Sequence, residues 1–397
     1  MESDFLSIDG IQGEDIRLCD FTKIFQQQKP IVIRALGLKW KGNSLHKKLE
    51  DDFQHVSTRF RVHKITDKSV AEGDCDFIDA TFGDFFQWCH QVEKEAGTYD
   101  EVTNVRREGT EESSPNPFYC YECTKYWAYC DYKHVQEEFG KGMVQAVAEA
   151  VDWDCIGCTL DPRNSTLWLG SKGAHTPLHY DTYGSNLVAQ LHGRKRWKIY
   201  PPSQTALLYP TRIPFEESTV YSQVDPLNPD LERFPKFSMA NPITFELGAG
   251  DVLFLPKHWW HFVECLGDRD HRISLTTNLW VDMDSDALDR IEEALVRFQV
   301  GQLTRCLDDR AVRPFYGPGE AALGVDMDLK LLHATIQGAK GEPVDWDRDL
   351  TPHQKESLVP KLLNAMTQNN VLEHIRKQIF SDAAGEKKDE EGTKEDL

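Results

Sequence analysis

Short apolar runs separated by turn-forming residues dominate the middle of the chain. Between Leu167 and Trp280 these runs are alternating or continuously apolar, and Gly, Pro, Asn and Asp stand between them. Many short strands joined by such turns are typical of antiparallel sheets that close into a barrel or jelly roll. We therefore expect a mainly β protein with flanking helices, whose core at 118–281 is a double-stranded β-helix of the jelly-roll or cupin-like kind.

The N-terminal region, 1–95, is expected to supply a strand and a helix that pack on this barrel. The apolar run Lys29–Arg34 predicts a strand, preceded by a short helical segment that Asp20 could cap. After Thr81 apolar residues recur at helical spacing and predict an amphipathic helix on the outside of a sheet: Phe82, Phe85, Phe86, Cys89 and Val92. Residues 96–117 are rich in Gly, Glu, Thr, Ser and Pro, so we expect a flexible acidic loop there.

The C-terminal region, 282–380, is expected to be helical. Behind Asp284 and Ser285, apolar residues again follow a helical period: Leu288, Ile291, Leu295 and Phe298. Three prolines are expected to interrupt the helices that follow: Pro343, Pro352 and Pro360. The tail 381–397 is charged and almost free of apolar residues, so we expect it to be disordered.

Composition narrows the range of partners. Of the 397 residues, 40% are hydrophobic, as expected for a globular protein. The net charge is −20, so we expect the protein to repel nucleic acid and anionic membranes. We find no apolar leader and no apolar run long enough to span a bilayer. We therefore expect an intracellular protein of the cytoplasm, with the nucleus as a second location, whose ten cysteines are reduced.

Two histidines and an aspartate form a candidate metal site. His179 and Asp181 are two residues apart, so in an extended segment both side chains point to one face while Tyr180 points to the other. His261 lies about eighty residues later, after Asp251–Pro256, a predicted buried strand behind a glycine turn. Two histidines and one carboxylate bind one face of an octahedral Fe(II) and leave positions open for oxygen chemistry.

The strand before His261 is what favours the metal site. A His-x-Asp pair alone is common, and its ordinary interpretation is a solvated or hydrogen-bonded pair. Trp259 and Trp260 would shield His261 from solvent. We expect the neighbouring histidines to be structural or solvent-facing: His175, His192 and His258.

A buried cation is predicted in the hairpin Asn186–Tyr200, which turns near Gly193. The period of two places Lys195 on the same face as the apolar residues Trp197 and Ile199. An inward ammonium without a partner charge is costly, and the hairpin offers no acidic residue, so a bound anion is the economical explanation. A lysine whose stem reaches out to solvent is the alternative. A small dicarboxylate that chelates iron would place its far carboxylate here, and the Thr176 hydroxyl could donate to the same group.

These residues resemble the JmjC domain of Fe(II)- and 2-oxoglutarate-dependent oxygenases, nearest to its small protein hydroxylases, which include an asparaginyl hydroxylase. The resemblance is strong from Leu167 to Trp280. Besides the metal residues and Lys195, it is carried by four segments: Ser274–Trp280, Tyr200–Pro202, Ser222–Pro235 and Tyr126–Tyr132. The last of these is similar to a branch of the family that is named for association with a small heat-shock protein.

The resemblance implies a role for each matching residue. His179, Asp181 and His261 would bind iron, Lys195 and Thr176 would hold the 5-carboxylate of 2-oxoglutarate, and two asparagines and a tyrosine would line the co-substrate pocket: Asn186, Asn278 and Tyr129. One residue too many stands between Asp181 and Asn186 compared with the asparaginyl hydroxylase.

As an activity, the resemblance implies an O2-consuming dioxygenase that couples decarboxylation of 2-oxoglutarate to succinate with hydroxylation of a protein side chain. Lysine demethylation and a vestigial fold that only binds a small heat-shock protein are the alternatives. The C-terminal helices are a candidate homodimer interface. A zinc module is a different kind of hypothesis, since Cys120 and Cys123 and then Cys155 and Cys158 have ligand spacing, with Cys130 between them.

Overall fold

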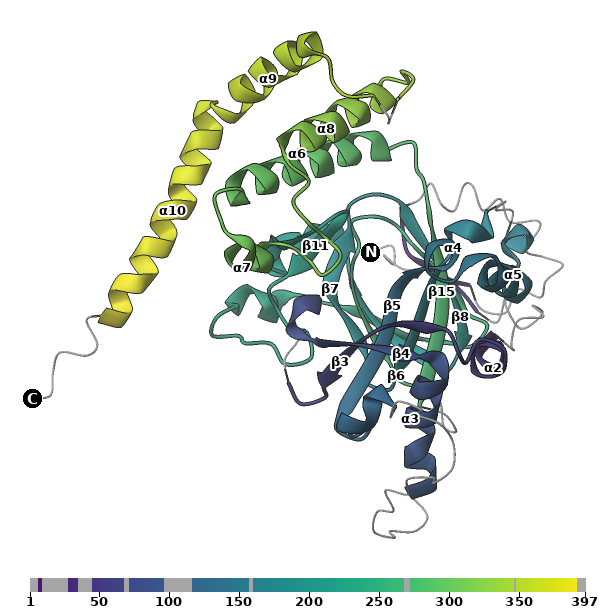
Figure 1. Ribbon diagram of the computed structural model, residues 1–397. Helices are drawn as coiled ribbons and strands as arrows, with labels where there is room; N and C mark the ends of the chain where they lie inside the picture. The colour runs from purple at the N-terminus through teal and green to yellow at the C-terminus, as the bar shows by residue number, and fades with distance from the viewer. Residues whose placement is uncertain are drawn as a thin grey trace, which may run out of the picture. The chain divides into compact units, whose positions relative to one another are not determined.

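The computed structural model describes residues 6–8, 28–34, 45–67, 71–95, 116–156, 160–267, 272–345 and 348–390. Two compact units divide the chain: Met1–Glu293 with Thr304–Ala321, and Ala294–Leu303 with Ala322–Leu397. The first unit contains both sheets (Figure 1), and the second is helical. The predicted helical segment near Asp20 and most of the predicted acidic loop, 96–115, lie outside the described residues.

Two sheets form the first unit (Figure 1). The larger sheet has nine strands in the order β1 (Leu6–Ile8), β2 (Ile31–Ile33), β13 (Val252–Leu255), β8 (Ser185–His192), β15 (Ile273–Val281), β6 (Thr166–Ser171), β5 (Tyr126–His134), β3 (Ser57–Lys64) and β4 (Asp76–Thr81). The smaller sheet has six strands in the order β10 (Pro210–Glu216), β11 (Thr219–Ser222), β7 (His175–Asp181), β14 (Trp260–Cys265), β9 (Arg194–Tyr200) and β12 (Ile243–Gly248). The predicted mainly β, cupin-like fold is confirmed.

Chain crossings between the sheets give the double-stranded arrangement. From β7 onward the chain passes to β8 in the larger sheet and then to β9 in the smaller one, and β13, β14 and β15 alternate in the same way. The described pairings between strands are antiparallel except that between β1 and β2. The N-terminal strands β2, β3 and β4 are hydrogen-bonded members of the larger sheet, which they extend at both sides of the core strands.

Helices cover the outer face of the larger sheet: α2 (Leu45–Asp51), α3 (Phe82–Glu95), α4 (Val135–Glu138) and α5 (Gly140–Ala150). The predicted amphipathic helix is α3. Its start is capped reciprocally, because Thr81 Oγ1 accepts from the Asp84 amide while the Asp84 carboxylate accepts from the Thr81 amide. Its apolar face is buried against the sheet, where Phe85 stacks on Phe60 of β3 with 5.1 Å between ring centroids.

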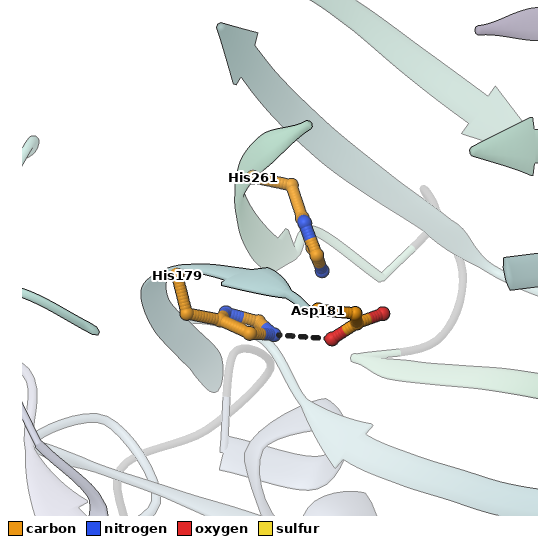
Figure 2. A group of neighbouring side chains, drawn as sticks. All are labelled: His179, Asp181 and His261. Carbon is orange, nitrogen blue, oxygen red and sulfur yellow. Dashed lines mark ion pairs between the residues drawn. The ribbon is translucent and has the colours of Figure 1, made fainter. Parts of the chain in front are cut away.

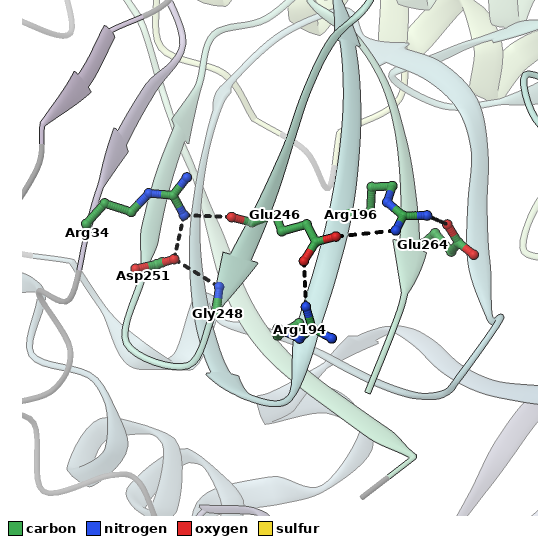
Figure 3. A network of polar contacts seen from close by, with 7 residues as sticks. All are labelled: Arg34, Arg194, Arg196, Glu246, Gly248, Asp251 and Glu264. Atoms are coloured by element: carbon green, nitrogen blue, oxygen red, sulfur yellow. Dashed lines mark hydrogen bonds and ion pairs between the residues drawn. The ribbon is translucent and has the colours of Figure 1, made fainter. Parts of the chain in front are cut away.

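The hairpin of β8 and β9 follows the predicted alternation. Lys195, Trp197 and Ile199 are buried between the sheets, whereas Arg194 and Arg196 lie on the outer face. There they pair with two glutamates of neighbouring strands, Glu246 and Glu264 (Figure 3). The turn requires glycine, because Gly193 has φ +63° and a Cβ there would lie 2.1 Å from the Ile273 carbonyl oxygen.

The C-terminal helices are α6 (Asp286–Thr304), α7 (Asp309–Val312), α8 (Val325–Ala339), α9 (Pro352–Met366) and α10 (Asn369–Glu390). Helix α6 starts after Ser285 as predicted. Pro343 lies between α8 and α9, and Pro352 is the first residue of α9, but the predicted interruption at Pro360 is wrong, because α9 runs through it. Pro360 is exposed, so water can solvate the carbonyl that it leaves unbonded.

The predicted disordered tail is also wrong as far as residue 390. Helix α10 continues to Glu390, and 391–397 lie outside the described residues. The segment 383–390 consists mainly of Ala, Glu and Lys, whose intrinsic helix propensity is high although they offer no apolar face. Among the described helices, none combines the length and the apolar character that crossing a membrane requires.

Candidate functional site

The predicted metal residues meet on the inner face of the smaller sheet. His179 of β7 is paired in register with His261 of β14, and Asp181 follows on the same face of β7. One ligand atom from each of the three lies within 4.8 Å of the others, and His179 Nε2 is 3.7 Å from Asp181 Oδ1 (Figure 2). Tyr180 points to the opposite face, where its ring meets Trp260. The period of two therefore places the side chains as the sequence predicts.

Neighbouring groups orient each of the three ligands. His179 Nδ1 is 2.7 Å from the Pro177 carbonyl oxygen and His261 Nδ1 is 2.9 Å from that of Trp259. Because a carbonyl can only accept, both rings carry their proton on Nδ1 when neutral and leave the Nε2 lone pair for a metal. Burial, helped by His261, lowers the pKa of His179 to about 4, which keeps this ring neutral.

The donor set fits a metal with open coordination positions. Two imidazole nitrogens and one carboxylate oxygen match the facial set of non-haem Fe(II) oxygenases, whereas structural zinc sites use four ligands. The carboxylate is oriented by Trp280, whose indole nitrogen donates to Asp181 Oδ2 at 3.0 Å. Within the described part of the chain this is the only cluster of three such ligands.

The cysteines of the zinc hypothesis do not form such a cluster where they are described. Cys120 is exposed, while Cys123 and Cys130 are buried. Cys158 and the side chain of Cys155 lie outside the described residues.

A cavity lies between the two sheets next to the candidate metal ligands. All eight residues that the sequence singled out line it: Tyr129, Thr176, His179, Asp181, Asn186, Lys195, His261 and Asn278. They come from six strands, so only the closed arrangement of both sheets brings them together.

Lys195 is the cation of this cavity. Its side chain is buried, and Nζ donates to Thr276 Oγ1 at 2.6 Å and to the Tyr129 hydroxyl at 3.0 Å. No carboxylate of the described residues lies within ion-pair distance of Nζ. Burial accordingly lowers the pKa of Lys195, and burial raises the pKa of Tyr129 well above its usual value. The environment of Lys195 thus suits an ammonium that receives an anion.

The two asparagines form a chain of hydrogen bonds across the larger sheet. Asn278 Nδ2 donates to Asn186 Oδ1 at 2.7 Å, and the Trp168 indole donates to Asn278 Oδ1 at 2.7 Å. Asn186 faces the cavity despite the extra residue that precedes it. Each amide orientation is therefore fixed by a neighbour.

The sequence analysis did not identify these further lining residues: Glu72, Tyr132, Trp168, Glu216, Glu217, Tyr221, Thr276 and Trp280. A signal for two of them was present, because Thr276 and Trp280 share the period of two with Asn278. Glu72 and Glu216 lie in segments that only the order of the strands brings close to the candidate metal ligands, so no local pattern predicted them.

The neighbouring histidines have structural contacts. His175 is buried, with Nδ1 3.1 Å from the Gly173 carbonyl oxygen, and His192 stacks on His46. His258 contacts the Thr182 carbonyl oxygen and Asp289. None of them lines the cavity among its described residues.

Comparison with known proteins fixes the family. The pattern of the cupin-like domain matches residues 19–287, which include every strand of both sheets except β1. The chain belongs to the cupin-like JmjC family. Relatives include HSPB1-associated protein 1 of Rattus norvegicus, 38% identical over 75% of this chain, and the HSPB1-associated protein 1 homolog of Danio rerio, 38% identical over 68% of it.

A second kind of relative matches about a third of this chain. Lysine-specific demethylase 8 of Xenopus tropicalis is 36% identical over 32% of this chain and 28% of its own length. The chain spans only 58% of the rat relative and 56% of the zebrafish relative, so these proteins are considerably longer than the segment they share with it. The JmjC relationship inferred from the motifs is thereby confirmed.

Proposed function

We propose that the protein is an Fe(II)- and 2-oxoglutarate-dependent dioxygenase that hydroxylates a protein side chain. The observation that carries this proposal is that one cavity contains three candidate metal ligands and a buried lysine, which has no carboxylate partner among the described residues. His179, Asp181 and His261 would hold the iron, which with 2-oxoglutarate and O2 supplies the oxidising chemistry.

The chain's own residues bind and orient the co-substrate. Lys195 and the hydroxyls of Thr276, Tyr129 and Thr176 receive its far carboxylate, and these neutral hydroxyls compensate the ammonium until the anion arrives. The hydrophobic layer around Trp197 and Val188 keeps water from this end of the cavity.

The experiment is succinate formation from 2-oxoglutarate with Fe(II) present. Wild-type protein should form succinate, and Asp181→Ala should not, while Glu246→Gln on the outer face of the sheet should match wild type. Mass spectrometry of candidate protein partners then looks for a gain of one oxygen. Absence of succinate with wild-type protein, or an equal rate with Asp181→Ala, would contradict the proposal.

Association with a small heat-shock protein is a second candidate function. It is favoured by the relatives named HSPB1-associated protein 1, which match three quarters of this chain in the rat sequence. A pull-down with the purified heat-shock protein, compared between wild type and Asp181→Ala, separates the two functions, because a binding role does not need the metal ligands.

A further inference from the structure

Helix α6 begins with three carboxylates on one face. Asp286, Asp289 and Glu293 follow the spacing of three and four residues that places side chains on the same side of a helix. Asp286 and Glu293 are buried. Buried carboxylates are costly unless they are paired and hydrogen-bonded. The partners of all three lie in loops next to the candidate metal ligands.

Asp286 holds the turn that follows Asp181. Its Oδ2 accepts from the Gly184 amide at 3.1 Å, and its Oδ1 accepts from Lys257 Nζ at 2.8 Å. Gly184 comes three residues after Asp181, and Lys257 comes four residues before His261. The carboxylate therefore joins the end of β7 to the loop that leads into β14.

Asp289 reinforces the same connection one turn further along the helix. It accepts from Lys257 Nζ at 2.5 Å, and its Oδ1 lies 3.3 Å from His258 Nε2. The same Nε2 lies 2.8 Å from the Thr182 carbonyl oxygen. Because a carbonyl can only accept, Nε2 carries a proton and donates it. The backbone continues this link, since the His258 amide donates to the Asp181 carbonyl at 2.8 Å.

Lys257 binds both aspartates at once. Its side chain is buried, and burial lowers its pKa, but the hydrogen bonds to Asp286 and Asp289 outweigh this and raise the pKa overall. The ammonium therefore stays charged. Buried ion pairs add little net stability, because desolvation offsets their attraction, and their best-attested use is to fix one geometry. The geometry fixed here is that of the loop before β14.

Glu293 holds a third loop, the turn between β10 and β11. Its Oε2 accepts from Arg212 Nη2 at 2.5 Å and from the Ser218 amide at 3.1 Å. The Ser218 carbonyl in turn accepts from the Thr182 amide at 2.8 Å, which ties this turn to the one that follows Asp181. Ser218 also lines the cavity. The start of α6 thus contacts three loops around the candidate metal ligands.

The loop before β14 depends on such contacts. His258 has φ +67°, in the left-handed region that costs a residue with a Cβ roughly 1–2 kcal/mol. The pairing of β14 with β7 also shifts register between His261 and Val263. A strained turn persists only where its surroundings determine it. The contacts of Lys257 and His258 with α6 provide this constraint.

We propose that Asp286 and Asp289 are positioning residues of the metal site. Through Lys257 they hold the ends of β7 and β14, and with them two of the three ligands, in the metal-binding geometry before a metal arrives. Neither aspartate is among the described lining residues of the cavity, so both act through other groups. The inference rests on the proposed function, which places a metal at these ligands.

Co(II) binding to the full chain tests this role, because Co(II) accepts the same ligands as Fe(II) and its visible absorption reports the coordination geometry. Asp286→Asn and Asp289→Asn remove the charge at nearly constant size. Each should weaken Co(II) binding by about tenfold or more and change the absorption spectrum, as for other groups that orient metal ligands. Glu292→Gln, the same kind of change at an exposed position of α6, should match wild type.

Hydrogen exchange of the metal-free protein separates positioning from general stability. In both variants the segments 181–184 and 257–261 should exchange faster, while 166–171 of β6 should exchange as in the wild type. The use of two aspartates keeps the test decisive if one variant does not fold. Equally faster exchange in all three segments, or wild-type Co(II) affinity in both variants, would overturn the proposal.

Failure of the positioning role is distinguishable from failure of the proposed function. Equally tight Co(II) binding to wild type and both variants would remove the positioning role and leave the metal site. Weakened binding in the variants, without succinate formation by the wild type, would leave the positioning role and remove the oxygenase. No Co(II) binding to the wild type would overturn both.

Discussion

Replacing Lys195 by methionine separates a ligand-binding lysine from a structural one. Methionine has a similar length, carries no charge and can fill the same space. In the folded protein, Lys195 Nζ contacts only the hydroxyls of Thr276 and Tyr129 among the described hydrogen-bonding groups. Burying the ammonium costs several kcal/mol of desolvation, and the substitution removes this cost. It also leaves each of the two hydroxyls with one hydrogen-bond partner fewer, which destabilises the folded state by about 1–3 kcal/mol for each hydroxyl.

These contributions oppose each other, so Lys195→Met should change the free energy of unfolding by less than about 2 kcal/mol. The affinity for 2-oxoglutarate should respond much more strongly. Losing one partner of a buried charge pair costs about 3–5 kcal/mol, which corresponds to a weakening of roughly 100-fold or more. Urea denaturation measures the first quantity, and quenching of the cavity tryptophans during 2-oxoglutarate titration measures the second.

Lys198→Met is the matched control, because Lys198 lies on the same strand but on the other face, where Nζ donates to the Pro226 carbonyl. It should bind 2-oxoglutarate like wild type. Wild-type affinity in Lys195→Met would refute the assigned role. Destabilisation by more than about 3 kcal/mol would show that the lysine is structural.

Three further predictions concern the metal, the hairpin turn and the pH dependence of stability. Asp181→Ala should weaken Fe(II) binding by more than about 100-fold, because losing even a group that only hydrogen-bonds to a metal ligand lowers metal affinity by about 10–100-fold. Metal analysis after dialysis that finds as much iron in the variant as in the wild type would contradict this. Gly193→Ala should destabilise the fold by about 3 kcal/mol, owing to the clash at Ile273 and the positive φ, whereas Gly73→Ala, with no atom within 4 Å of the added Cβ, should unfold at the wild-type urea concentration. Burial raises the pKa of Glu216 from 4.5 to about 8, so between these pH values the folded state binds a proton that the unfolded state has lost, and the free energy of unfolding should fall as pH rises from about 5 to 8. The urea midpoint of Glu216→Gln should fall less over this range. Parallel profiles of urea midpoint against pH for the variant and the wild type would count against the raised pKa.

Local spacing was sufficient for the residues whose placement depends on one strand or one hairpin. His179 and Asp181 share a face because side chains alternate along a strand, and Lys195 is buried because its hairpin alternates in the same way. The helix after Thr81 was equally accessible, since its apolar period and its cap are local. Pro360 and the helical segment up to Glu390 were misjudged. The exposure that lets a helix run through Pro360, and the helix propensity of a segment without an apolar face, leave no mark on the spacing of apolar residues.

By itself, therefore, the sequence determined the strand-rich core, the shared face of His179 and Asp181 and the inward direction of Lys195, through periods that act within one element. Only the tertiary structure decided what else lines the cavity. Glu72 comes from a short turn before β4, Tyr132 from a bulge in β5, and Glu216 from a hairpin at the edge of the smaller sheet. Their convergence depends on strand order, and so on contacts between residues far apart in the chain that no local pattern records.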